Sequence, residues 1–231
     1  MNNFLIENYH TLLNEIQKVA EKSGRDLNSI KLVAVSKNFP SDNIKTLYEE
    51  GHKDFGENKA QELREKYEDL KNLDIVWHFI GRIQTNKIKY IVPIAEYIHS
   101  VWRMKEIEEI QKKAEEINKT QKVLLEINIS GEQSKAGLIP SEVEAFLQDA
   151  TSFKNIKIIG LMTMAPYTDN VEVIRNVFRS LRELRGNLNK KYPSIKELSM
   201  GMTNDYKIAI EEGATLLRIG TRIFGNRYLP E

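Results

Sequence analysis

The sequence predicts an α/β protein built as a single (β/α)8 TIM-type barrel with an extra N-terminal helix. Short apolar runs alternate along the 231 residues with longer segments of helical periodicity. Eight such runs, in a chain close to the ~250 residues typical of this barrel, favour that fold. An open, doubly wound sheet is the alternative. No Gly/Ser/Pro-rich linker divides the chain, so we expect one domain over residues 1–231.

The expected strands are short runs rich in β-branched or large apolar residues. Such nearly continuous runs are typical of parallel strands that are buried on both faces. They cover residues 31–36, 54–57, 76–80, 97–101, 123–129, 156–164, 197–200 and 215–219. The second run is short and polar, which makes it a weaker strand candidate than the fourth to eighth runs.

The segments that flank these runs carry helical spacing and capping signals. The extra helix is expected from Phe4 to Lys22 and ends at Ser23-Gly24. Another helix is expected from Ser141 to Ala150, after Pro140. Ser141 and Glu144 form a capping-box pair at its start. The other helices are expected over residues 41–50, 58–70, 103–118, 170–190 and 205–212.

Composition excludes several classes of function. Lys and Arg total 34 against 33 Asp and Glu, so the net charge of +1 gives no reason to expect nucleic acid or an anionic membrane as a partner. The chain has no cysteine, which rules out disulfides, a thiolate nucleophile and a zinc–thiolate site. The N-terminus lacks the pattern of a signal peptide, and no apolar stretch approaches the ~20 residues that span a bilayer. We therefore expect a soluble, cytoplasmic protein.

Lys37 is the first candidate for chemistry, because function in such barrels gathers at the carboxyl ends of the strands. It closes the first expected strand, after Val33-Ala34-Val35. In a chain with many lysines it could simply be a solvated strand end. The functional interpretation is a Schiff-base lysine, since a low-dielectric barrel mouth lowers the pKa of an ammonium and leaves an amine that attacks an aldehyde.

Two glycine-containing loops suggest a phosphate site at the ends of the last two strands. Ser199 and Gly201 lie in the first loop, and Gly220 and Thr221 in the second. Backbone N–H groups at such loops attract a dianion, and this fold commonly binds phosphate there. Either loop alone reads as an ordinary turn. Arg218, inside the last apolar run, needs a partner, which is either a structural carboxylate or a ligand atom such as a ring nitrogen.

Two other kinds of site receive little support. The histidines are scattered without metal-ligand spacing, and those in or at the expected strands are better explained as hydrogen-bonded core residues. No serine lies in a G-x-S-x-G elbow, so a hydrolase triad is not indicated.

An ordered set of motifs resembles the pyridoxal phosphate (PLP) homeostasis proteins, relatives of the barrel domain of bacterial alanine racemase. The set spans almost the whole chain. Its main motifs are Ala34-Val35-Ser36-Lys37, Phe55-Gly56-Glu57-Asn58, Trp77-His78-Phe79-Ile80-Gly81, His99-Ser100-Val101, Asn128-Ile129-Ser130-Gly131-Glu132, Gly160-Leu161-Met162, Leu198-Ser199-Met200-Gly201-Met202 and Arg218-Ile219-Gly220-Thr221. The set also includes Gln61-Glu62, Gln84, Asn86-Lys87, Lys135, Gly137 and Ile223-Phe224-Gly225.

The resemblance implies a monomeric PLP-binding barrel. Lys37 matches the Schiff-base lysine of the family, and Arg218 an arginine near the pyridine nitrogen. Asn58 matches a polar residue that lines the pocket. The phosphate-binding loops match Ser199, Gly201, Gly220 and Thr221. One departure is Trp102, which stands where the family usually carries an aspartate.

The resemblance also implies PLP binding and a role in intracellular vitamin B6 homeostasis without established catalysis. A racemase needs a second base, which the relatives supply from an additional domain, and we expect no room for one in a chain that ends at Glu231. Arg218 as a cation would weaken the pyridine ring as an electron sink. The alternatives are a weak PLP-dependent racemase or lyase, and a barrel for another phosphorylated metabolite. Transient delivery of PLP to apo-enzymes, and secondary binding at Lys135, stay open.

Overall fold

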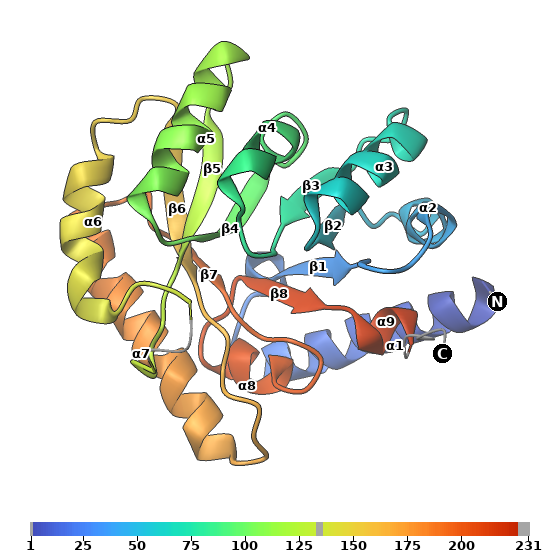
Figure 1. Cartoon of the computed structure of the whole chain (residues 1–231). Coiled ribbons are helices and arrows are strands. Elements are labelled where there is room, and N and C mark those ends of the chain that lie inside the picture. Colours follow the sequence, from blue (N-terminus) through green and yellow to red (C-terminus); the bar gives the residue numbers. More distant parts are fainter. Residues whose placement is uncertain (1, 133–135, 226–231) are drawn as a thin grey trace.

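A computed structural model describes residues 2–132 and 136–225, and its strands close into a parallel barrel in the order β1 to β8. Each strand pairs with the next, and β8 pairs with β1 (Figure 1). The structure therefore confirms the predicted barrel and excludes the alternative of an open, doubly wound sheet. The strands are β1 (Lys31–Val35), β2 (Asp54–Glu57), β3 (Val76–Phe79), β4 (Tyr97–Val101), β5 (Gln121–Glu126), β6 (Ile156–Met162), β7 (Glu197–Ser199) and β8 (Leu216–Ile219).

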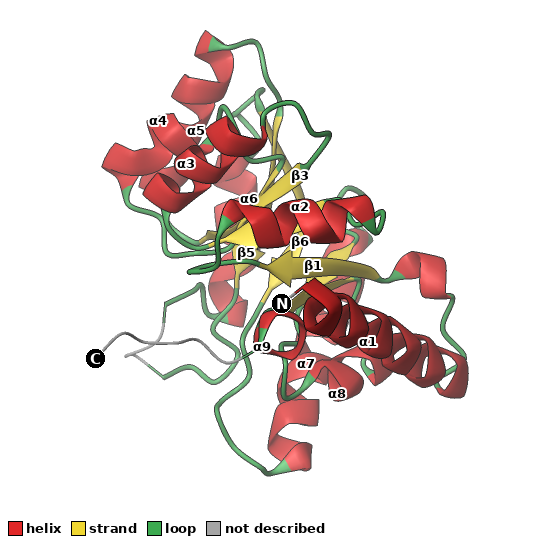
Figure 2. Ribbon diagram, turned by 90° about the vertical axis from the view of Figure 1, so that its right-hand side faces the viewer, coloured by secondary structure: helices red, strands yellow, loops and turns green. Residues whose placement is uncertain are grey.

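Helices surround the strands, as Figure 2 shows with helices in red and strands in yellow. They are α1 (Asn2–Lys22), α2 (Ser41–Glu49), α3 (Ala60–Leu70), α4 (Ile88–Ile91), α5 (Met104–Glu116), α6 (Val143–Ala150), α7 (Val171–Asn189), α8 (Tyr206–Glu211) and α9 (Thr221–Phe224). The extra N-terminal helix α1 packs against α2, α8 and α9, beside the point where β8 meets β1. No helix in the described part of the chain is long and apolar enough to cross a membrane.

Three local expectations change in the structure. The helix expected from Asn58 begins at Ala60, which leaves Asn58 in the loop after β2. Ser141 and Glu144 do not form the expected capping box, because the turn starts one residue earlier, at Pro140. There the Glu142 carboxylate accepts the N–H of Ile139 at 3.1 Å. The short helices α4 and α9 were not expected, since four residues are too few to show a period.

The core has an outer and an inner part. The outer part lies between the strands and the helices and is continuous through most of the buried apolar residues. The inner part fills the barrel with a small apolar cluster formed by Val33, Leu124, Ile159, Met162 and Leu216. The inner cluster fills only part of the barrel, and buried polar side chains occupy the rest. Those polar side chains position the candidate site.

Close packing of β6 against β7 requires a glycine. A Cβ at Gly160 would lie 2.3 Å from the carbonyl oxygen of Glu197, its partner in the strand register. A backbone oxygen cannot move aside as a flexible side chain can, so the strands would have to separate.

We therefore expect Gly160→Ala to destabilise the fold by about 2–3 kcal/mol, the usual cost of overpacking. The matched control is Gly186→Ala, because Gly186 lies in α7 with no atom near its Cβ position. The control should gain about 0.5–1 kcal/mol from helix propensity. Urea unfolding of both variants measures the two effects, and equal stability of the two would contradict the strand-contact argument.

Candidate functional site

A cavity of about 580 Å³ opens at the carboxyl ends of the strands, where the barrel rule predicts a site. Its walls come from the loops after β1, β2, β3, β6 and β7 and from the end of β8. The cavity brings together five of the seven predicted site residues. These are Lys37, Asn58, Arg218, Gly220 and Thr221. A volume in this range suits a small cofactor or metabolite.

Lys37 is half-buried and lines the cavity from the turn that follows β1. Beneath the turn, the buried Lys66 ammonium donates to the Ser36 carbonyl oxygen at 2.8 Å and to the Glu57 carboxylate at 2.7 Å. The Ser36 hydroxyl donates to the same carboxylate at 2.6 Å. The backbone on the strand side of Lys37 is therefore held by a buried ion pair.

The other side of the turn is held through Asn38, which has a positive φ of 65°. Its backbone N–H donates to the Glu62 carboxylate at 2.5 Å, and that carboxylate also accepts from Lys66 at 2.7 Å. Asparagine tolerates this left-handed conformation better than most residues. Lys37 thus sits between two anchors that share one ammonium group.

Asn58 presents a polar atom that lacks a partner within the described residues. Its Oδ1 is buried and accepts no hydrogen bond, although the residue lines the cavity. The Asn58 backbone is fixed by Gly81, because a Cβ there would lie only 2.0 Å from the Asn58 carbonyl oxygen. A buried acceptor costs free energy unless a donor reaches it. This atom therefore marks a place where a ligand donor fits.

Arg218 is 5% exposed and forms part of the cavity wall. Its guanidinium donates to the Ser199 hydroxyl at 2.5 Å and to the Thr163 carbonyl oxygen at 3.0 Å. Burial lowers the pKa of Arg218 to about 10, while the carboxylates of Asp205 and Glu126 act in the opposite direction. The group stays cationic at neutral pH. Sequence analysis left its partner open, and the described residues supply a hydroxyl and a carbonyl.

Ser199 and Gly201 lie outside the cavity wall. Ser199 is fully buried, with its hydroxyl bonded to Arg218. Gly201 has a φ of 95°, and its carbonyl oxygen accepts the Arg218 N–H at 2.9 Å. From the same loop, the cavity is lined instead by the next four residues, Met202, Thr203, Asn204 and Asp205. Contact of Ser199 and Gly201 with a phosphate stays a prediction.

The loop after β8 lines the cavity through Gly220 and Thr221, the latter being the first residue of α9. A Cβ at Gly220 would lie 3.0 Å from the Val35 carbonyl oxygen, so only glycine packs easily against β1. The first N–H groups of a helix have no partner within it and can bind an anion. Gly220 and Thr221 thus lie where the sequence placed a phosphate loop.

Two features of the site were not predicted. The long loop from Met164 to Val171, between β6 and α7, forms a large part of the cavity wall. Glu126, at the end of β5, is buried beside a smaller cavity of about 180 Å³ that shares wall residues with the first. Burial raises its pKa to about 7. The rule of strand ends includes both positions, but nothing in the sequence singled them out.

Of two other residues that the sequence analysis named, Trp102 does not line the cavity, and Lys135 is not among the residues that the structure describes. Trp102 is half-buried, and its backbone N–H donates to Glu106 at 2.9 Å. The described chain holds no cluster of three or more residues suited to a metal ion.

The comparisons with known proteins agree with this fold and site. The profile of the alanine racemase N-terminal domain matches residues 9–228. A pyridoxal phosphate homeostasis protein of Aquifex aeolicus is 46% identical over 222 residues, which cover 96% of this chain and 97% of the relative. Another, from Pseudomonas aeruginosa, is 36% identical over 223 residues and covers 96% of each chain.

Solved structures give the same result. PipY of Synechococcus elongatus, with PLP bound, is 33% identical, with a TM-score of 0.81, and covers 91% of this chain and 99% of that chain. An alanine racemase of Clostridium difficile, 15% identical with a TM-score of 0.74, shares the fold over 57% of its length. Fold and cavity define a barrel of the alanine racemase N-terminal type. Within that class, the chain belongs to the family of pyridoxal phosphate homeostasis proteins.

The raised pKa of Glu126 gives a testable effect on stability. The unfolded carboxyl titrates near 4.5, whereas the folded one titrates near 7. The folded state therefore binds more protons between these values, and stability is lost as the pH rises through about 7. Glu126→Gln should stabilise the protein by about 1–3 kcal/mol at pH 8 and change it little at pH 5.

Urea unfolding at both pH values measures this difference. The control is Glu144→Gln, which removes an exposed carboxylate paired with Lys191. Surface pairs contribute ~0–1 kcal/mol, so the control should show a small change. An equal effect of Glu126→Gln at pH 5 and pH 8 would show that the carboxyl titrates normally.

Proposed function

We propose that this chain binds PLP as a Schiff base on Lys37 and serves intracellular PLP homeostasis as a binding protein, without clear catalytic activity. The observation that carries the proposal is the single cavity that Lys37, Asn58, Arg218, Gly220 and Thr221 line together. These residues come from three separate parts of the sequence. The family membership and the PLP bound to PipY support the same cofactor here.

The side chains around the cavity fit the groups of PLP. Lys37 would form the covalent link, and the first turn of α9 with Thr221 would hold the phosphate. Arg218 engages two of its five N–H donors with Ser199 and Thr163, and it would present its remaining edge toward the pyridine nitrogen. The buried Oδ1 of Asn58 would accept a hydrogen bond from the ligand.

The charge of Arg218 supports a holding role. When bound, PLP supplies an electron sink for carbanions, and protonation of the ring nitrogen strengthens that sink. A guanidinium that stays cationic at neutral pH would disfavour protonation of a nitrogen beside it. The chain would then hold the cofactor while weakening its power as a catalyst.

The groups that could move a proton on the open side of the cavity support the same conclusion. Asp205 accepts the backbone N–H of Met202 at 2.5 Å, which ties it to its own loop. Tyr167 is 98% exposed, and Asp169 is exposed as well. A general base must be held within hydrogen-bond reach of its proton, and these two groups are not held in that way.

The proposal extends to the setting of the protein. A monomeric, cytoplasmic chain would exchange PLP transiently with PLP-dependent apo-enzymes, with no nucleic acid or membrane partner. The near-neutral net charge of +1 supports the last point.

Substitution of Lys37 tests the cofactor link. The wild-type protein incubated with PLP should absorb near ~420 nm, the band of a lysine–PLP Schiff base. Lys37→Ala should lose at least nine-tenths of that band, whereas Lys59→Ala, which changes an exposed lysine outside the cavity, should keep it. A full band in Lys37→Ala would show that another lysine holds the cofactor. Absence of the band in the wild type would favour a different phosphorylated ligand.

Proton exchange tests the holding role against the alternative of a weak racemase or lyase. The test is to incubate the PLP-loaded protein with common amino acids in deuterated water and to follow loss of the α-proton signal by NMR. A binding protein should give exchange close to that of free PLP, because the cationic Arg218 disfavours protonation of the ring nitrogen and so weakens the electron sink. Exchange that is at least a hundredfold faster, and that is lost in Lys37→Ala, would establish an enzyme.

A further inference from the structure

A continuous row of hydrogen bonds crosses the inside of the barrel, from the cavity to the opposite end. It starts where Arg218 donates to the Ser199 hydroxyl at 2.5 Å, and the hydroxyl lies 2.8 Å from His99 Nδ1. His99 Nε2 lies 2.9 Å from His78 Nδ1. The row ends at Asp54, whose Oδ1 lies 3.0 Å from His78 Nε2.

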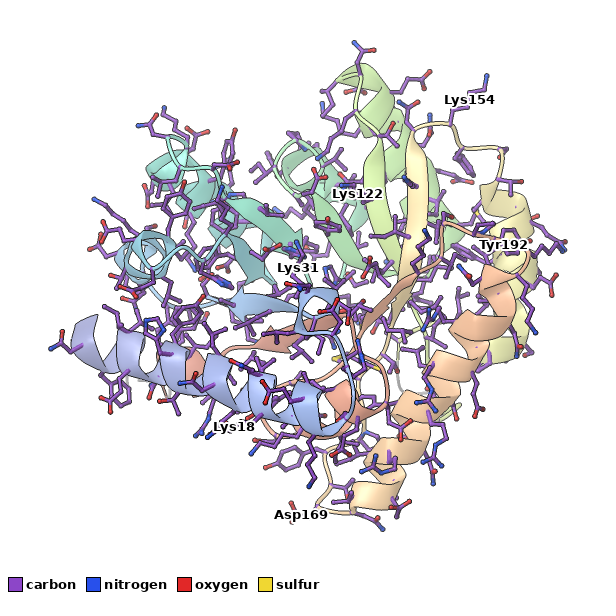
Figure 3. All side chains as sticks on the ribbon, turned by 180° about the vertical axis from the view of Figure 1, so that it is seen from behind. Lys18, Lys31, Lys122, Lys154, Asp169 and Tyr192 are labelled. Carbon is purple, nitrogen blue, oxygen red and sulfur yellow. The ribbon has the colours of Figure 1, made fainter. Side chains whose placement is uncertain are left out.

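Lys31 closes the row by donating to the same Asp54 oxygen at 2.9 Å. Lys31 and Asp54 are the first residues of β1 and β2, so they lie at the amino ends of the strands. Figure 3 shows Lys31 near the centre of the barrel seen from behind, close to Lys122 at the start of β5. The Lys31 side chain is 41% exposed, so the row reaches solvent at that end.

When both imidazoles are neutral, the two ends of the row fix the direction of every bond in it. Arg218 has only donors, so the Ser199 oxygen must accept at that end. The Asp54 carboxylate has only acceptors, so His78 must donate from Nε2 at the other end. His78 Nδ1 is then an acceptor, and His99 must donate to it from Nε2. His99 Nδ1 accepts the remaining proton, that of the Ser199 hydroxyl.

This order requires both imidazoles to be neutral and protonated on Nε2. Burial supports neutrality, because His78 and His99 are fully buried and burial lowers the pKa of both. The ring of Tyr97 stacks on His78 at 4.6 Å, and Lys31 and Lys122 lie over that ring. Lys31 lowers the pKa of His78 further, and although Asp54 and Glu96 raise it, burial keeps it below its usual value.

We propose that Ser199, His99, His78 and Asp54 are positioning residues, which hold the Arg218 guanidinium in one orientation through a one-directional row of hydrogen bonds. The inference rests on the proposed function in so far as Arg218 faces a bound cofactor. Bonds that point the same way polarise one another, so the negative charge of Asp54 makes each acceptor along the row stronger, up to the Ser199 oxygen that accepts from Arg218. The orientation of a group in the cavity is thus set from the far end of the barrel.

The direction of the row is tested in the protein without cofactor, by ¹⁵N NMR of its histidine side chains. Both His78 and His99 should show a protonated Nε2 and an unprotonated Nδ1 at neutral pH. Asp54→Ala removes the terminal acceptor, and it should change the protonation pattern of His99 as well as that of His78. A protonated Nδ1 on either histidine in the wild type would overturn the proposal, whatever the variants do.

The control for propagation is His52→Ala. His52 is also buried beside Asp54, but its Nε2 lies 2.8 Å from the backbone carbonyl oxygen of that residue, outside the row. It should leave the signals of His78 and His99 unchanged. If Asp54→Ala does not fold, Ser199→Ala opens the row at its cavity end and should alter His99. Unchanged His99 signals in the variant that folds would overturn the proposal.

The consequence for the cofactor is read from the loaded protein. Asp54→Ala should weaken PLP binding about tenfold, the size expected for residues coupled in one network, and should shift the Schiff-base band. His52→Ala should do neither. An unshifted band and unchanged affinity in Asp54→Ala would overturn the positioning role. If the wild-type protein shows no Schiff-base band, the proposed function is refuted. The NMR experiment on the cofactor-free protein would still test the direction of the hydrogen bonds.

Discussion

The burial of one cation, Arg218, is the constraint on which the site and the barrel interior depend. An arginine that is 5% exposed must be met by acceptors and by negative charge, or it would destabilise the fold. Ser199 and Thr163 supply the acceptors, and Glu126 and Asp205 supply charge from β5 and from the start of α8. The raised pKa of both carboxyls shows that burial also disfavours their ionisation. The cavity mouth is therefore a balance of buried charges of both signs.

A second buried cation, Lys66, lies beneath the turn after β1 and also needs acceptors and negative charge around it. Lys66 is 5% exposed and donates to Glu57, Glu62 and the Ser36 carbonyl oxygen. Breaking such a pair costs more than forming it contributes, because the remaining charge stays buried. Lys37 is thus carried by a turn that cannot shift without exposing that network. A rigid turn suits a lysine that must meet one aldehyde in one position.

The sequence predicted most strands well, because burial on both faces leaves a nearly continuous apolar signal; β2 is short and polar and gave the weakest signal. It also predicted part of the cavity wall, since Lys37, Gly220 and Thr221 follow strands and a barrel gathers strand ends at one mouth. It left the partners of Arg218 open, because the contacts of β8 with Ser199 at the end of β7 and with Thr163 after β6 have no signature in a linear pattern. It assigned Ser199 to the phosphate loop, whereas that side chain points into the interior and lies outside the cavity wall. Position along a strand, which alternates between faces, decides this, and it depends on a register that the sequence alone did not supply.

His78 and His99 are hydrogen-bonded core residues, as the sequence indicated, and their hydrogen bonds connect the barrel interior to Arg218 through Ser199. Apolar side chains around Leu124 and Met162 fill one part of the barrel interior. A polar row through the remaining space is tolerated only when every donor and acceptor in it is satisfied. The row from Arg218 to Asp54 meets that condition in one direction only. Because a single reversed neutral imidazole would set two buried acceptors or two buried donors against each other, the orientation of Arg218 and the protonation of both histidines are determined together.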